Sequence, residues 1–238
     1  MPKQNPTMSS AASPGKRPWR GFWPAIVLAV LLVTTLPAEF IANDRPLLVS
    51  YVGYLYFPVL RDHPETTFGG DFETTADFTD SYLKFQIERH GWVLWPLIPF
   101  SPSAPIIDLP EPAPTPPSDR NWLGTDSRQR DVLARLIYGL RASLILGLVV
   151  AAICGVATIL AKRKTAAVFY LPAVAVAVLA ALDFAGQGSR PSLGALLHEG
   201  LANPNAPWLG LTGFLGLAVV LILLIFFGRA LRHALNDA

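Results

Sequence analysis

The chain has 238 residues, of which 52% are hydrophobic and only 15% are charged, and its mean hydropathy is +0.40. Because soluble domains carry charges on about a quarter of their residues, this composition excludes a typical soluble domain. The net charge of +2, without a basic stripe, argues against nucleic acid as a partner, and the single Cys154 excludes both an internal disulfide framework and a cysteine-based zinc site.

Four segments are long and apolar enough to cross a bilayer, which takes roughly 20 helical residues. They lie at 22–41, 142–160, 165–182 and 208–227. The first follows a basic stretch, but its apolar run is longer than that of a signal peptide, so we interpret it as a retained anchor. The alternative, buried helices of a soluble protein, is disfavoured by runs of this length with so few polar interruptions. The sequence therefore predicts an α-helical integral membrane protein with about four transmembrane helices.

The distribution of lysine and arginine predicts the orientation of these helices, because basic residues of short loops stay in the cytoplasm. The basic sites are the tail 1–21, the turn 161–164 with Lys162, Arg163 and Lys164, and the C-terminal tail 228–238. The loop 183–207 has only Arg190. All three basic sites share one side if the spans alternate, so both termini are predicted to be cytoplasmic and Lys162, Arg163 and Lys164 to set the topology.

The outer segment 42–130 is too long for a simple loop and is predicted to be structured. Residues 45–60 are rich in β-forming residues around Gly53 and predict two short strands joined by a tight turn. Residues 79–91 predict a helix with Asp80 as N-cap and Gly91 as its stop. The residues expected to pack this helix are Tyr82, Leu83, Phe85 and Ile87.

The proline-rich part of this segment, 108–119, is interpreted as a semi-rigid extended linker rather than a recognition ligand. The chemistry of metal ligands gathers only in Asp62, His63, Glu65, Asp71 and Glu73. Their spacing matches no ligand motif, so a solvated acidic loop is the better interpretation. Since no catalytic triad, phosphate loop or HExxH motif is present, we predict no enzyme activity, no bound metal and no cofactor.

The stretch 121–147, "NWLGTDSRQRDVLARLIYGLRASLILG", is the most informative. Asp126 or Ser127 can cap a helix that starts near Arg128, and the pattern predicts an interfacial amphipathic helix at 131–141 leading into the second span. Its arginines, including Arg135 and Arg141, are expected to reach lipid headgroups, or to form a solvated face.

This stretch also resembles the entry to the transmembrane domain of permease subunits in peptide and nickel ABC importers. The residues that carry the resemblance are Gly124, Thr125, Asp126, Arg130, Asp131, Arg135, Gly139 and Arg141. Further segments, "FGGDF", "GWVLWPLIPF" and "LDFAGQGSRPSLGALLHEG", resemble the YejE-type permeases, which are associated with oligopeptide and microcin C uptake. The resemblance runs from about residue 21 to the C-terminus, apart from about 161–181.

The resemblance implies a place in the bacterial inner membrane, with 42–130 as a mixed α+β periplasmic insertion between the first and second spans. It also implies a second permease subunit, cytoplasmic ATP-binding subunits that bind the ATP, and a periplasmic peptide-binding protein. The expected function is to form part of the path that peptides take across the membrane.

Two features depart from the family pattern. Gln129 stands where the family usually has glycine, which affects the turn before the helix. Such permeases have about six spans and a cytoplasmic loop with an "EAA…G" pattern that docks into the ATPases, whereas here "AKRKT" joins two spans directly. A truncated permease remnant or membrane scaffold is therefore the alternative function.

Glycines in the apolar segments leave a second question open. They either let helices pack closely or simply fill the lipid-facing surface, and the sequence favours neither. The residues concerned are Gly147, Gly155, Gly210, Gly213 and Gly216.

Overall fold

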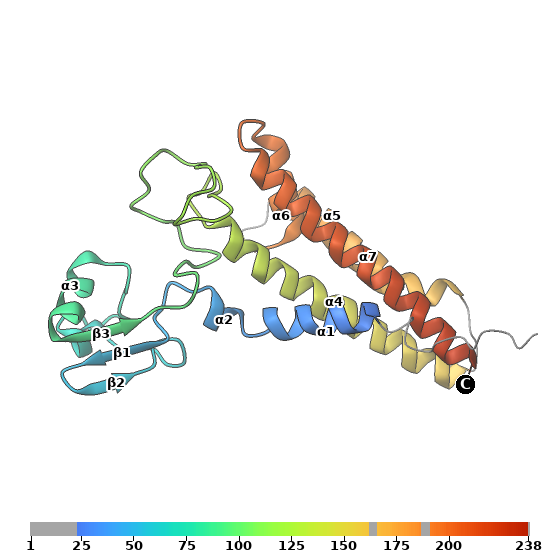
Figure 1. The fold of residues 1–238 in the computed structure, drawn as a ribbon, viewed down its shortest axis with the longest axis horizontal. Helices are drawn as coiled ribbons and strands as arrows, with labels where there is room; N and C mark the ends of the chain where they lie inside the picture. The colour runs from blue at the N-terminus through green and yellow to red at the C-terminus, as the bar shows by residue number, and fades with distance from the viewer. Residues whose placement is uncertain (1–22, 162–165, 187–190, 238) are drawn as a thin grey trace, which may run out of the picture.

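A computed structural model of the chain describes residues 23–161, 166–186 and 191–237. Figure 1 shows an elongated molecule in which a bundle of long helices holds the C-terminus and a small α/β part lies at the opposite end. The predicted cytoplasmic turn with Lys162, Arg163 and Lys164 lies outside the described residues.

Three helices of the bundle are long and apolar enough to cross a membrane. They are α4 (Val132–Ala161), α5 (Leu171–Gly186), which a 3₁₀ turn (Ala166–Tyr170) precedes, and α7 (Pro207–Asp237). In an apolar 18-residue stretch of α4, and in one of α7, only 33% is buried inside the protein. Most of the apolar side chains of these two helices therefore face outward. Exposed apolar surface of this extent is typical of contact with a partner or a lipid bilayer.

The predicted interfacial helix at 131–141 is not a separate element. Residues 132–161 form one continuous helix of 30 residues, because this stretch contains no proline that would end it near residue 141.

The first apolar segment differs from the prediction of a single helix over 22–41. It forms α1 (Trp23–Thr35) and the short α2 (Ala38–Ile41), separated at Pro37. Proline has no N–H to donate to the preceding turn, so the helix breaks there. Leu28 of α1 is only 1% exposed, and Trp23 lies 5.5 Å from the ring of Phe226 in α7, so α1 belongs to the bundle.

The core of the bundle lies where α1, α4, α5 and α7 meet. Its buried members are Leu28, Leu144, Ala173, Val176, Leu193, Val220, Leu223 and Leu224. Leu193 comes from α6 (Leu193–Ala202), a helix that precedes α7 and is capped by Ser192, whose Oγ accepts a hydrogen bond from Ala195 N at 3.2 Å.

Close packing of α6 against α7 answers the question about the glycines for most positions. A Cβ at Gly213 would lie 2.6 Å from Leu197 N, and one at Gly200 would lie 2.0 Å from Gly210 N, so both sites require glycine. Side chains at Gly147 and Gly216 would meet Leu224 and Leu136. A Cβ at Gly155, in contrast, would have no neighbouring atom within 4 Å, so this position faces open space.

The α/β part consists of a three-stranded antiparallel sheet and one helix. The strands are β1 (Leu48–Tyr51), β2 (Tyr54–Tyr56) and β3 (Gly91–Leu94), in the order β2-β1-β3. The predicted hairpin around Gly53 is confirmed, because Val52 and Gly53 form its turn with φ of 48° and 81°. The predicted helix is also confirmed as α3 (Ser81–His90), and Asp80 accepts its capping bond from Tyr82 N.

Two details of α3 were predicted wrongly. Leu83 and Ile87, four residues apart, are buried against the sheet, whereas Tyr82 and Phe85 lie on the outer face and are 48% and 56% exposed. Gly91 does not form a left-handed stop but opens β3 in extended conformation, and a Cβ there would lie 1.8 Å from Ser50 O.

The chain returns from the sheet to the bundle beside α2. Asn43 N donates to Ile98 O at 3.1 Å, Ile98 N donates to Ile41 O at 2.9 Å, and Tyr138 of α4 donates through its hydroxyl to Ala42 O at 3.1 Å. A small apolar cluster covers this junction, formed by Ala42, Ile98, Phe100, Ile106 and Ala134.

The proline-rich segment 108–119 is a closed loop rather than the predicted extended linker. Nη2 of Arg120 donates to both carboxylate oxygens of Asp108 at 3.0 Å, so the two ends of the segment meet. Both side chains are substantially exposed, so the pair fixes geometry more than it adds stability.

Two glycine substitutions test the packing of the bundle. Gly213→Ala is expected to lower the free energy of unfolding by about 1–3 kcal/mol, because the new methyl group meets the backbone of α6. Gly155→Ala is the matched control and should be neutral or stabilising by up to about 1 kcal/mol, since alanine favours helix and the site is open. Thermal or denaturant unfolding of the detergent-solubilised chain measures both; equal effects would contradict the packing.

Candidate functional site

The loop that enters α4 is held by hydrogen bonds to two other parts of the chain. Thr115 N donates to Thr125 Oγ1 at 2.9 Å, and the indole N–H of Trp208 at the start of α7 donates to Thr125 O at 3.2 Å. Gly124 has φ of 73°, and a Cβ there would lie 2.6 Å from Thr115 O. Only glycine fits this conformation and this approach without strain, so Gly124 and Thr125 fix the loop against α7.

Asp126 is the centre of this loop and is fully buried. Its Oδ1 accepts hydrogen bonds from Arg128 N at 2.8 Å and Arg130 N at 2.9 Å, which closes the turn. Its Oδ2 accepts from Arg130 Nε at 2.7 Å and from the guanidinium of Arg135. Asp126 was expected as a helix cap, but it is an anion held by two arginines.

The carboxylate of Glu199 on α6 completes the arrangement. Arg135 donates to Glu199 Oε2 at 2.7 Å, Arg130 lies 3.7 Å from the same oxygen, and Ser127 N donates to Oε1 at 3.0 Å. We call Asp126, Arg130, Arg135 and Glu199 the ion cluster. It contains two positive and two negative groups, and it joins the loop and α4 to a helix more than 60 residues away.

Burial distinguishes the ion cluster from a surface feature. Arg135 is 1% exposed and Arg130 is 4% exposed, so the prediction that Arg135 reaches lipid headgroups or forms a solvated face is wrong. The physical reason is that two carboxylates compensate its charge inside the protein, where an unpaired guanidinium would be far too costly. Arg135 Nε has no hydrogen-bond partner within the described part of the chain.

Asp131, not Asp126 or Ser127, caps α4. Its Oδ1 accepts from Ala134 N at 2.7 Å and its Oδ2 accepts from Asn121 Nδ2 at 2.8 Å. The helix consequently begins at Val132 rather than near Arg128. Burial raises the pKa of Asp131 above its usual range, although hydrogen bonds from Asn121 and from backbone N–H groups oppose this.

Gln129 occupies a turn position whose backbone conformation suits glycine. Its φ is 63°, a left-handed conformation that costs a residue with a side chain about 1–2 kcal/mol. The turn is retained despite the side chain, and Gln129 O accepts a hydrogen bond from Ile106 N at 2.8 Å. This bond connects the turn to the loop that follows the sheet.

The remaining motif residues lie further along α4. Gly139 lies against the start of α6, where a Cβ would be 3.2 Å from Leu193 N. Arg141 donates to both oxygens of Glu39 in α2 at 2.8 Å, and its guanidinium lies 4.6 Å from the centre of the Tyr138 ring. Arg141 therefore pairs with a carboxylate of the chain itself, at a partly exposed site.

Sequence reasoning missed Glu199, Asn121, Thr115 and Trp208 as members of this site. The sequence could have indicated a role for Glu199, because it is the single acidic residue between Asp183 and Asp237, in a region otherwise rich in apolar residues. A lone acid there requires a cationic partner, and the arginines of the 128–141 stretch were available.

Comparison with known proteins identifies the family. The chain is 31% identical to the inner membrane ABC transporter permease protein YejE of Escherichia coli (strain K12), over 317 aligned residues that cover 91% of this chain and 93% of the relative. The chain belongs to the YejE family of ABC transporter permeases. It is also 28% identical to the peptidoglycan transport system permease protein YejE of Agrobacterium fabrum (strain C58), covering 91% of this chain and 89% of that relative. Neither a known family profile nor a solved structure matches the chain.

Both alignments are longer than the chain itself. They run over 317 and 341 positions, more than the 238 residues of the chain, so each YejE relative has many positions without counterpart here. Because most of each relative is covered, these positions lie inside the aligned range.

Substitution of Arg135 tests the ion cluster. Arg135→Met should destabilise the chain by about 3–5 kcal/mol, because it removes one of the two cations that buried Asp126 and Glu199 share. Arg128→Met in the same loop is the control, since Arg128 is exposed and forms no ion pair among the described residues; it should change stability by less than about 0.5 kcal/mol. Unfolding in detergent measures the difference, and similar losses would show that the cluster is not structural.

The dependence of stability on pH tests Glu199 separately. Burial opposes its ionisation, but hydrogen bonds from Ser127 and Arg135 outweigh burial and hold the pKa of Glu199 below its usual value of 4.5. A lowered pKa in the folded state stabilises the fold above pH 4.5, and this contribution is lost as the pH falls below that value.

The melting temperature of the wild type should therefore exceed that of Glu199→Gln above pH 5, and the gap should close as the pH falls toward 3.5, about one unit below the unperturbed pKa. A gap that stays constant or widens in acid would contradict the charged role of Glu199.

Proposed function

We propose that the chain is a permease subunit of an ABC importer for peptides or peptide-like compounds and forms part of the translocation path. Its relationship to YejE over nearly the whole chain carries this proposal. The Agrobacterium relative is named as a peptidoglycan transport permease, and peptidoglycan fragments contain short peptides, which supports a peptide-bearing cargo.

The proposed orientation places both termini in the cytoplasm and the segment 42–130 in the periplasm, with about four spans. The arrangement in Figure 1 supports it, because α1 begins on the side of the bundle that also holds the C-terminus and the end of α4, whereas the α/β part lies at the other end. The basic residues of the two tails and of the turn 161–164 then share the cytoplasmic side.

The proposed partners are a second permease subunit, cytoplasmic ATP-binding subunits that bind the ATP, and a periplasmic peptide-binding protein. In this assembly the ion cluster lies at the outer ends of α4 and α7, where it connects the periplasmic segment to the spans.

The missing internal stretch favours a second candidate, a transport-incompetent permease remnant or scaffold. We place the gap between α4, which ends at Ala161, and the 3₁₀ turn that begins at Ala166. The four residues between them are too few to form helices that dock into an ATPase. The absent stretch would then contain the family's coupling loop and two spans.

Co-purification with the partner subunits distinguishes the two functions. If the chain is a coupled permease, it should co-purify with the second permease and the ATP-binding subunits, and peptide with binding protein should stimulate ATP hydrolysis in nanodiscs at least severalfold over the ATP-binding subunits alone.

A chimera supplies the control. The extra stretch of the Escherichia coli relative is inserted between Ala161 and Ala166 and assayed in the same way. If the natural chain fails to hold the ATP-binding subunits and the chimera holds them, the coupled permease is rejected in favour of the remnant.

A further inference from the structure

A small pocket of about 220 Å³ lies beside the ion cluster, between α6 and the loop before α4. Its wall on α6 is one face of that helix, formed by Ala195, His198, Glu199 and Ala202. The opposite wall is formed by Ser127, Arg128, Arg130 and Arg135. The volume exceeds that of one water, about 30 Å³, and is below the roughly 300 Å³ at which pockets for drug-sized ligands begin, so the pocket suits a small ion or a single polar group.

The buried arginines of this pocket have more hydrogen-bond donors than the described residues accept. Arg135 donates to these residues only through Nη1, and since its Nε is fully buried, Nη2 is the nitrogen left for a bound group. Arg130 donates to Asp126 through its side-chain Nε, whereas its Nη2 lies 3.7 Å from Glu199 Oε2, beyond hydrogen-bond distance. Because a guanidinium has five N–H groups, both arginines keep unused donors.

The charges around the pocket do not cancel. Arg128 is exposed and forms no ion pair among the described residues. Together with Arg130 and Arg135 it gives three positive charges against the two carboxylates of Asp126 and Glu199, so one positive charge is left over. His198 in the lining adds to this excess when it is protonated. The pocket therefore favours an anion.

The number of guanidinium groups favours a phosphate over a carboxylate. Arginine binds both through parallel N–H···O bonds, but a carboxylate offers only two oxygens, whereas a phosphate offers oxygens in several directions. Arg128 and Arg130 belong to the loop and Arg135 to α4, so donors come from more than one side of the pocket. A phosphodiester carries one negative charge, which would balance the one uncompensated positive charge.

We propose that this pocket binds a phosphate group, through Arg128 and the unused donors of Arg130 and Arg135. The phosphate is either free inorganic phosphate or part of a phospholipid headgroup. Its binding needs no partner subunit and is independent of transport. Because it balances the excess charge of the arginines, it stabilises the entry to α4.

Isothermal titration of the full chain with inorganic phosphate tests the proposal. The chain is delipidated in dodecyl maltoside, a detergent without phosphate, and sodium chloride keeps the ionic strength constant. Phosphate should bind to the wild type, and Arg128→Met should weaken this binding at least about tenfold, as expected for the loss of a charged hydrogen bond. Phosphate should also raise the melting temperature of the wild type, because it binds only the folded chain.

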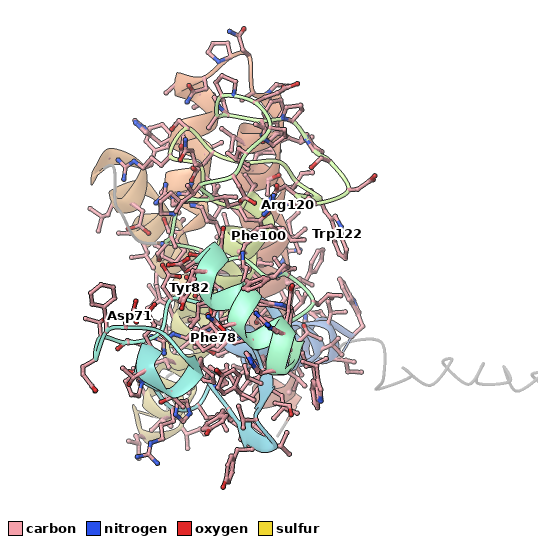
Figure 2. All side chains as sticks on the ribbon, turned by 90° about the vertical axis from the view of Figure 1, so that its left-hand side faces the viewer. Asp71, Phe78, Tyr82, Phe100, Arg120 and Trp122 are labelled. Atoms are coloured by element: carbon pink, nitrogen blue, oxygen red, sulfur yellow. The ribbon has the colours of Figure 1, made fainter. Side chains whose placement is uncertain are left out.

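Arg89→Met is the matched control. Arg89 is an exposed arginine in the last turn of α3 and does not line the pocket. Figure 2 shows α3 at the front of the molecule, with Tyr82 labelled beside it, whereas α6 lies in the helical bundle of Figure 1. Arg89→Met should bind phosphate like the wild type. If Arg128→Met does not fold, Ala202→Leu takes its place with the same expectation, since it fills the pocket without removing a charge.

Native mass spectrometry of the chain before delipidation distinguishes the two sources of phosphate. A phospholipid that the wild type retains and Arg128→Met loses would identify the headgroup as the source. A phospholipid that both retain is bound elsewhere, and free phosphate is then the source, as it is if the wild type retains none.

Two results would overturn the proposal. One is the absence of any heat of binding when the wild type is titrated to millimolar phosphate. The other is a loss of affinity in Arg128→Met that is no larger than in Arg89→Met. Because the titration uses the chain alone, its failure leaves the permease assignment intact.

Discussion

The buried ion cluster is the constraint on which the rest of the structure depends. Taking Asp126, Arg130, Arg135 and Glu199 out of water costs several kcal/mol for each ion, and their mutual contact, with hydrogen bonds from backbone N–H groups to both carboxylates, offsets that cost. The loop before α4, the first turns of α4 and the middle of α6 must therefore stay together. Since α6 packs on α7 through glycine, the position of α7 follows from the same contact.

The α/β part is attached to this constraint by specific hydrogen bonds and by the small apolar cluster at its junction with α4. Ile106 N donates to Gln129 O, Thr115 is bonded to Thr125, and the Tyr138 hydroxyl reaches the chain beside α2. The segment that contains Ile106 is thus hydrogen-bonded directly to the turn that contains Asp126.

Local signals made part of this architecture predictable from the sequence. A glycine in a tight turn predicted the β1–β2 hairpin, and an aspartate at the N-cap position predicted α3. Long apolar runs predicted the helices of the bundle. Features that depend on residues distant in the sequence were not predictable. Arg135 has the spacing of an arginine that faces lipid headgroups, and only its contact with Glu199 on α6 shows that it is buried. Likewise, Gly213 and Gly155 look alike in the sequence and differ only in what faces them.

The continuity of α4 has a mechanical consequence. Its 30 residues form a rod of about 45 Å, with the ion cluster at one end and Ala161 at the other. A tilt of about 5° around its midpoint would move each end by about 2 Å in opposite directions. Without a break at the junction of 141 and 142, a rigid tilt of α4 that displaces its Ala161 end also displaces Arg135, so the two ends of the helix move as one element.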